Sequence, residues 1–108
     1  MLTGPEMRKF RRVPMVAAIE IEVGDVRFTA EARNISVAGM LIRSSRTFDQ
    51  NSILRIWFTL PGTQQPLGVR GTILHVSPDA YMGVQFDEIS EAGRAAIEIY
   101  VNQASEFA

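Results

Sequence analysis

Hydrophobic and polar residues alternate in short segments through most of this chain, and this alternation strongly limits the folds it can adopt. In the clearest segment the hydrophobic residues are Ile19, Ile21 and Val23, and the residues between them are Glu20 and Glu22. Because successive side chains of a strand point to opposite faces of a sheet, this segment predicts a strand with one buried and one solvated face.

Turn-forming residues separate these segments, and their spacing indicates the fold class. Turn signals occur at Gly24-Asp25, at Pro61-Gly62 and at Ser77-Pro78-Asp79-Ala80. The expected strands are Met15–Val23, Val26–Arg33, a third that starts at Met40, Ile53–Leu60, Leu67–Val76 and Tyr81–Phe86. Short strands at this spacing are typical of an antiparallel barrel or sandwich and not of a parallel sheet.

The last part of the chain has a different period. Ser90 is a suitable N-cap, and residues that suit a buried face recur about every 3.6 positions, at Ile97, Tyr100, Val101 and Ala104. This pattern predicts one amphipathic C-terminal helix with one face packed on the β structure.

The composition is that of a folded protein without disulfides. Of the 108 residues, 46% are hydrophobic, 21% are charged and none is cysteine, so we expect one complete domain without a thiolate site. The net charge of −1 argues against attraction of the whole surface to nucleic acid or to an anionic membrane. No hydrophobic segment approaches the roughly 18 residues that would span a bilayer, and we expect a cytoplasmic protein with no membrane partner.

Basic residues are concentrated near the start of the chain. The first twelve positions contain one acid, Glu6, and four of the 11 basic residues, Arg8, Lys9, Arg11 and Arg12. A local cluster of cations on a nearly neutral protein favours a small anionic partner over a long polyanion. Taken alone, the cluster is equally well interpreted as a solvated run of charge on a terminus.

This cationic segment is expected to be separate from the folded part. Residues 1–12 have no hydrophobic period and contain Gly4 and Pro5, which predicts a flexible N-terminal arm. Pro14 restricts the preceding residue to extended geometry, so we expect the folded domain to span residues 13–108.

A polar segment, Asn34-Ile35-Ser36-Val37-Ala38-Gly39, interrupts the alternation before the third expected strand. In an extended chain the Asn34 and Ser36 side chains leave the same face, and Gly39 allows either an unusual backbone φ or the close approach of a ligand. An amide, a hydroxyl and uncovered backbone N–H groups can bind a polar ring or a phosphate. In isolation, an ordinary turn is the simpler interpretation.

Taken together and in this order, the two segments resemble the PilZ domain family. Arg8 and Arg12 form an R-x-x-x-R motif, and the second motif, N-x-S-x-x-G, is formed by Asn34, Ser36 and Gly39. The family motifs are R-x-x-x-R and D/N-x-S-x-x-G, and the family binds the bacterial second messenger cyclic di-GMP.

The resemblance extends over nearly the whole chain. The Arg12-Val13-Pro14 junction and the Met82–Phe86 segment are also similar to the family. The resemblance implies an all-β fold, a six-stranded antiparallel PilZ-type barrel with an N-terminal arm and one C-terminal α-helix, in a stand-alone receptor.

The first motif implies that Arg8 and Arg12 bind the guanines and phosphates of the dinucleotide, as the motif arginines do in the family. The forked donors of arginine match the O6 and N7 acceptors of guanine and the oxygens of a phosphate, and the guanidinium plane can stack on a base. Lys9 and Arg11 lie outside the motif and would provide supporting charge.

The second motif implies that Asn34, Ser36 and Gly39 belong to the same binding surface. Its first position is often aspartate in the family, where the carboxylate accepts hydrogen bonds from the guanine N1–H and N2–H groups. Asn34 has one acceptor oxygen and no charge, so we expect this contact to be weaker here.

No catalytic, metal or cofactor site is expected. His75 is the single histidine and lies within an expected strand, where a packing role is commoner than that of a ligand or base. The acidic residues are dispersed, and nothing resembles a nucleophile with its base. The protein is therefore not expected to be an enzyme.

Two classes of function remain. In the first, cyclic di-GMP binds and orders the N-terminal arm, and a downstream protein partner, which the sequence does not identify, recognises the changed surface. In the second, the chain is a PilZ-like adaptor that binds proteins and not the nucleotide, although the intact pair of Arg8 and Arg12 argues against this. Binding of DNA or RNA by the basic arm is less favoured, and would depend steeply on salt.

Overall fold

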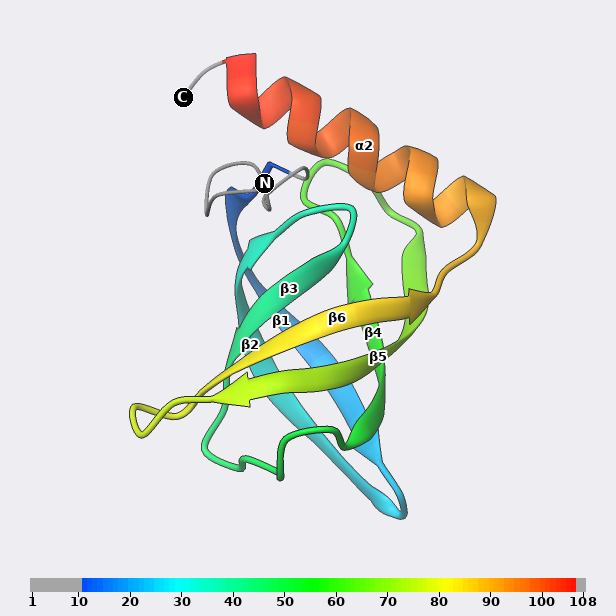
Figure 1. Ribbon diagram of the computed structural model, residues 1–108. Helices are drawn as coiled ribbons and strands as arrows, with labels where there is room; N and C mark the ends of the chain where they lie inside the picture. Colours follow the sequence, from blue (N-terminus) through cyan, green and yellow to red (C-terminus); the bar gives the residue numbers. More distant parts are fainter. Residues whose placement is uncertain (1–10, 107–108) are drawn as a thin grey trace, which may run out of the picture.

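The computed structural model describes residues 11–106 and shows a closed β-barrel with one helix across its end (Figure 1). The strands are β1 (Val13–Val23), β2 (Val26–Ile35), β3 (Gly39–Arg43), β4 (Ile53–Thr59), β5 (Pro66–Val76) and β6 (Tyr81–Glu88). The helix α2 (Glu91–Glu106) follows β6. The predicted six-stranded antiparallel barrel with a C-terminal helix is confirmed.

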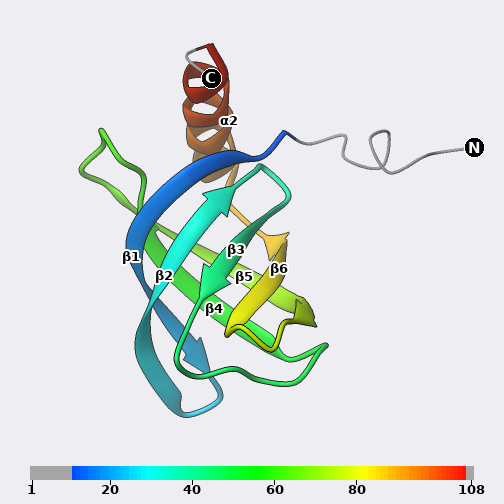
Figure 2. The ribbon, with the colours of Figure 1, turned by 90° about the vertical axis from the view of Figure 1, so that its left-hand side faces the viewer.

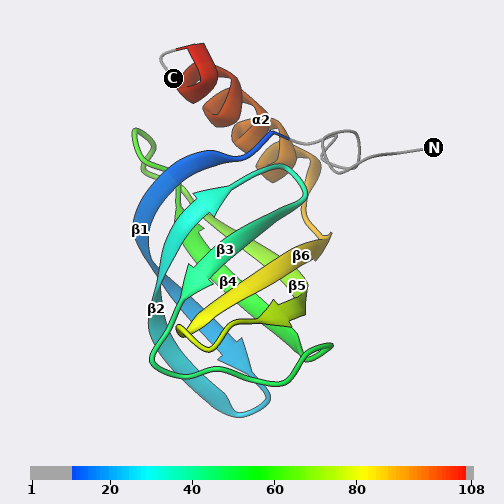
Figure 3. The same ribbon diagram turned by 60° about the vertical axis from the view of Figure 1, so that its left-hand side comes forward.

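Neighbouring strands run antiparallel in the order β1-β2-β3-β6-β5-β4, and the barrel closes where β1 pairs with β4. Figures 2 and 3 show β1 curving around the barrel from the helix end to the hairpin that joins it to β2. In that hairpin Gly24 has a φ of 57°, a left-handed conformation that a residue without a Cβ adopts at little cost.

Alternate side chains of the strands fill the barrel, as the sequence pattern predicts. In β1, Ile19 and Ile21 are buried whereas Glu20 between them is exposed. The largest fully buried side chains are Met15, Ile19, Ile21, Ile35, Ile42, Leu54, Ile56, Leu60, Ile73, Met82 and Ile97. Since each is worth about 1.5–3 kcal/mol on burial, this core is the main source of stability.

Helix α2 covers one end of the barrel with the face that its period predicts. Ile97 and Val101 are buried against the barrel, and the Tyr100 hydroxyl donates a hydrogen bond to the Pro14 carbonyl oxygen at 3.3 Å. Ser90 is the N-cap, because its Oγ accepts the Gly93 N–H at 3.0 Å. Within residues 11–106, no helix is long and apolar enough to cross a membrane.

Each observed strand differs from the predicted one by one or two residues at one end, and the differences in β1 and β2 affect the site. β1 begins at Val13 and not at Met15, because Val13 is buried and pairs with Ile35. β2 extends beyond Arg33 to Ile35, because both Asn34 and Ile35 pair with β1 and with β3. The expectation that the sheet is interrupted from Asn34 onwards is therefore wrong, and only residues 36–38 form the turn between β2 and β3.

The packing of the barrel core predicts that two isoleucine substitutions change the free energy of unfolding by very different amounts. Ile21 is 0% exposed inside the barrel and Ile99 is 59% exposed on α2. We expect Ile21→Ala to lower the free energy of unfolding by about 2–5 kcal/mol, because it leaves a cavity, and Ile99→Ala to change it by less than about 1 kcal/mol. Urea denaturation measures both, and equal losses would show that the β1–β4 seam is not packed as described.

Candidate functional site

The pairing of β1 with β2 brings Arg12, the second arginine of the first predicted motif, toward the same end of the barrel as the second motif. Pro14 lies opposite Asn34, and Val13 lies opposite Ile35. Arg12 directly precedes this ladder and is exposed, as is Arg11. Arg12 therefore lies next to the turn that follows Ile35, although the two are far apart in sequence. Arg8 and Lys9 lie outside the described residues.

The Ser36 hydroxyl is used within the turn. Its Oγ accepts the backbone N–H of Ala38 at 3.0 Å and that of Gly39 at 3.2 Å, and the Ser36 N–H donates to the Gly39 carbonyl oxygen at 2.9 Å. Ser36 is only 3% exposed. The expectation of uncovered N–H groups is therefore wrong for Ala38 and Gly39, and Ser36 does not share the outward face of Asn34 because it lies beyond the end of β2.

Gly39 is required by the close approach of a neighbouring strand. It pairs with Gln85 of β6, and a Cβ at this position would overlap the Val84 carbonyl oxygen. Its φ is not the reason, because the glycines with positive φ among residues 11–106 are Gly24 and Gly62. The Phe86 N–H donates to the Ala38 carbonyl oxygen at 2.8 Å, so the turn is held directly against β6.

Asn34 has an unsatisfied acceptor. Its side chain lies on the outer face of β2, yet its Oδ1 is buried and has no hydrogen-bond partner among the described residues. Leaving a buried acceptor unpaired costs about 1–3 kcal/mol, so such groups are rare and call for a cause. A ligand that offers an N–H group would satisfy this oxygen once the side chain turns outward.

Strand pairing places Asn34 in a row of outward residues that crosses four strands. Asn34 lies opposite Leu41 of β3, Leu41 opposite Gly83 of β6, and Gly83 opposite His75 of β5. The exposed His75 ring lies over Gly83, where a Cβ would overlap its Nε2. His75 therefore belongs to the same outer surface as Asn34. The sequence carried no signal for this, because the register between strands distant in the chain is not a local property.

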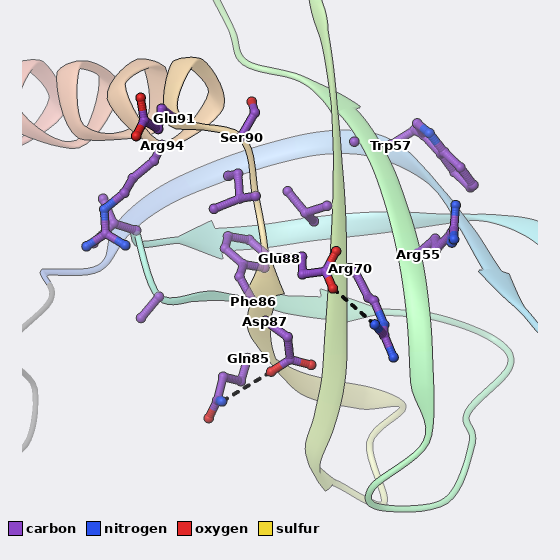
Figure 4. Close-up of a pocket in the computed structure, with 15 residues that line it drawn as sticks. Arg55, Trp57, Arg70, Gln85, Phe86, Asp87, Glu88, Ser90, Glu91 and Arg94 are labelled. Atoms are coloured by element: carbon purple, nitrogen blue, oxygen red, sulfur yellow. Dashed lines mark hydrogen bonds and ion pairs between the residues drawn. The ribbon is translucent and has the colours of Figure 1, made fainter.

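A groove of about 1050 Å³ lies on the other side of the same turn (Figure 4). Val37 and Ala38 line it, whereas Arg12, Asn34, Ser36 and Gly39 do not. Its other lining residues come from β4, β5, β6, the link between β6 and α2, and the start of α2. They are Arg55, Trp57, Gly68, Val69, Arg70, Gln85, Phe86, Asp87, Glu88, Ile89, Ser90, Glu91 and Arg94. In the described part of the chain, no group of three or more histidine or acidic side chains could hold a metal ion.

The six-stranded barrel with its C-terminal helix defines the fold class of this protein. The PilZ domain family model matches residues 6–103. Because the match covers most of the chain, the protein belongs to the PilZ domain family, as its motifs indicated. PilZ domains are regulatory receptors for cyclic di-GMP and not enzymes.

Solved structures of PilZ proteins share the fold at low sequence identity. The Bacillus subtilis inhibitor of motility MotI/DgrA has a TM-score of 0.81 and 16% identity, over 99% of this chain and 57% of that chain. The PilZ domain of YcgR from Escherichia coli with c-di-GMP has a TM-score of 0.70 and 9% identity, over 93% of this chain and 92% of that one. The Borreliella burgdorferi PlzA protein in complex with c-di-GMP has a TM-score of 0.65 and 18% identity, over 94% of this chain and 38% of that chain. A comparison with curated proteins found no match.

The contact at Gly39 predicts that a single methyl group there disturbs the fold. We expect Gly39→Ala to lower the free energy of unfolding by about 1–3 kcal/mol, because the new Cβ meets the backbone of β6, which cannot move aside easily. Gly68→Ala is the control, because its Cβ would lie 3.2 Å from Nε1 of the Trp57 side chain, which can rotate. Thermal unfolding compares the two, and a Gly39→Ala variant as stable as Gly68→Ala would contradict the β3–β6 register.

Proposed function

We propose that this protein binds cyclic di-GMP on the surface formed by Arg8, Arg12, Asn34, Ser36 and Gly39, and passes the signal to a partner protein. The observation that carries the proposal is the buried, unpartnered Oδ1 of Asn34, next to which the β1–β2 register brings Arg12. Membership of the PilZ family supports it, as does the fold shared with YcgR and PlzA, whose structures contain c-di-GMP.

Each residue has a role that suits its chemistry. Arg8 and Arg12 donate charge-assisted hydrogen bonds to phosphates and to guanine O6 and N7. Asn34 Oδ1 accepts an N–H of guanine, which satisfies the buried oxygen. Ser36 holds the turn in shape through its two bonds to backbone N–H groups, and Gly39 lets the turn lie close against β6.

Three further residues support the same surface. Lys9 and Arg11 add positive charge beside the motif arginines. The exposed His75 ring at the far end of the outer row can stack on a base, a contact worth about 1–3 kcal/mol where aromatic rings and bases meet. The His75 ring can lie in this position because Gly83 beneath it has no side chain.

The relay begins with ordering of residues 1–12 by the ligand, in a cytoplasmic protein. Fixing a backbone residue costs about 1–2 kcal/mol, so the measured affinity is lower than the contacts alone would provide. The alternative, an adaptor of PilZ fold that does not bind the nucleotide, is distinguished by titration of the protein with cyclic di-GMP. A protein that releases no heat and shows no saturable binding is the adaptor.

The motif arginines carry the first functional prediction. We expect Arg8→Ala and Arg12→Ala each to weaken cyclic di-GMP binding by about 1.5–3 kcal/mol, because each removes charge-assisted hydrogen bonds. Arg43→Ala is the matched control, since Arg43 is exposed at the opposite end of β3 from Gly39. Isothermal titration calorimetry measures all three, and wild-type affinity in both motif variants would refute the assignment.

Asn34→Leu separates a binding role from a structural one. The substitution removes the unpaired buried oxygen at similar side-chain size, so we expect the free energy of unfolding to stay the same or to rise by about 1 kcal/mol. The affinity for cyclic di-GMP should nevertheless fall by about 0.5–1.5 kcal/mol, because one hydrogen bond is lost. Asn102→Leu on the exposed face of α2 is the control. Lower stability with unchanged affinity would mean that Asn34 serves only the fold.

A further inference from the structure

Two arginines face each other on the outside of the barrel. Arg55 of β4 lies directly opposite Arg70 of β5, and both side chains are exposed. Side chains at such positions are about 5 Å apart at Cβ, and like charges there are destabilising. Arg70 is compensated by Glu88, with Nη1 3.2 Å from the carboxylate oxygen Oε1. Arg55 takes part in none of the ion pairs found among residues 11–106.

Glu22 offsets part of this repulsion from the other side, without a direct ion pair. It lies opposite Arg55 in the β1–β4 ladder, yet the two do not form an ion pair among those found in the described chain. Arg55 is therefore a cation held beside a second cation, at the edge of the groove. Such an arrangement is stabilised when an anionic group from another molecule enters between the two guanidinium groups.

The opposite side of the groove, at the end of β6 and the start of α2, carries carboxylates. Asp87 accepts hydrogen bonds from the Thr72 hydroxyl at 2.5 Å and from the Gln85 amide at 3.3 Å. Glu91, in the first turn of α2, takes part in none of the ion pairs of the described chain. Figure 4 shows Arg55 on the β4 side of the groove and Glu91 on the helix side. The groove thus has a cation on one side and a carboxylate on the other, neither of which takes part in an ion pair of the described chain.

Apolar side chains also line the groove. Val37, Phe86 and Ile89 are half-buried lining residues, and the Phe86 ring is fixed by stacking on Phe58, with 6.5 Å between ring centroids. The lining contains three arginines and three carboxylates, so its formal charge is zero. A long polyanion would gain from Arg55 and Arg70 but would be repelled by the carboxylates.

We propose that this groove, which we call the Arg55 groove, binds a segment of a partner protein. That segment carries a carboxylate for Arg55 and Arg70, a cationic side chain for Glu91, and an apolar residue between them. The inference names a surface for the partner that the proposed function requires, and to that extent it rests on the proposed function.

The turn of residues 36–38 connects the Arg55 groove with the proposed nucleotide surface. Val37 and Ala38 line the groove, while the Ser36 hydroxyl and the Ala38 carbonyl oxygen bind this turn to Gly39 and to β6. A ligand that contacts Asn34 and the backbone around Gly39 therefore acts on the wall of the groove. The partner segment is expected to bind with different affinity in the presence of cyclic di-GMP.

The test is selection from a library of random displayed peptides, with the whole protein as bait. We expect enriched peptides to contain an acidic and a basic residue separated by an apolar one. Synthetic copies should bind about tenfold more weakly to the Arg55→Gln/Arg70→Gln variant, because two exposed charge contacts are lost. The control variant Arg43→Gln/Arg46→Gln removes two exposed arginines outside the groove and should bind the peptides like the wild type.

Four outcomes would overturn the inference. Enriched peptides that bind the Arg55→Gln/Arg70→Gln variant as well as they bind the wild type would place the binding site elsewhere. A selection that enriches no peptide would show that the groove does not bind such a segment. Tighter binding of a single-stranded oligonucleotide than of any peptide, lost in the same variant and steeply salt-dependent, would identify a nucleic-acid surface. A weaker affinity for cyclic di-GMP in the variant would make the groove part of the nucleotide site. If the wild type binds no cyclic di-GMP but selects such peptides, the proposed function fails and the groove stands.

Discussion

The two antiparallel ladders of β1 are the interactions on which the rest of the structure depends. One ladder joins β1 to β2 along nearly its whole length, and the other joins it to β4 and closes the barrel. Closure buries Ile21 against the core and removes the sheet edges that would otherwise invite further pairing. The first ladder also sets Arg12 beside the turn after Ile35, and the second sets Arg55 at the edge of the groove, so both proposed binding surfaces follow from the position of this strand.

The turn between β2 and β3 is the part of the fold that both surfaces share. It is short and internally bonded, because Ser36 satisfies two of its backbone N–H groups, and it lies so close to β6 that Gly39 cannot carry a side chain. Asn34 precedes it on the outer face, and Val37 and Ala38 face the groove. Under the two proposals, this turn is the element through which binding at one surface would affect the other.

The two candidate surfaces have one physical property in common. At each, a polar group lacks a close partner within the described chain: the buried Oδ1 of Asn34 has no donor, and Arg55, opposite Arg70, forms no ion pair. Elsewhere the residues suit the local structure that they form, as Ser90 does at the N-cap of α2 and as the alternating residues of β1 do. Departures of this kind from local consistency are expected at functional sites.

The amino-acid sequence by itself determined the elements of this protein and its family. Alternation such as Ile19, Glu20, Ile21 depends only on neighbouring residues, and so do the Ser90 cap and the spacing of the two motifs; all of these can be read along the chain. The tertiary structure decided what those residues meet. In the tertiary structure the Ser36 hydroxyl bonds within the turn, and β6 lies so close to Gly39 that a side chain there would overlap it. His75 lies in the same outer row as Asn34, and Arg55 lies opposite Arg70. These contacts depend on the register between strands far apart in the sequence, and register is chosen by the packing of the whole barrel and by its closure, which no local pattern encodes.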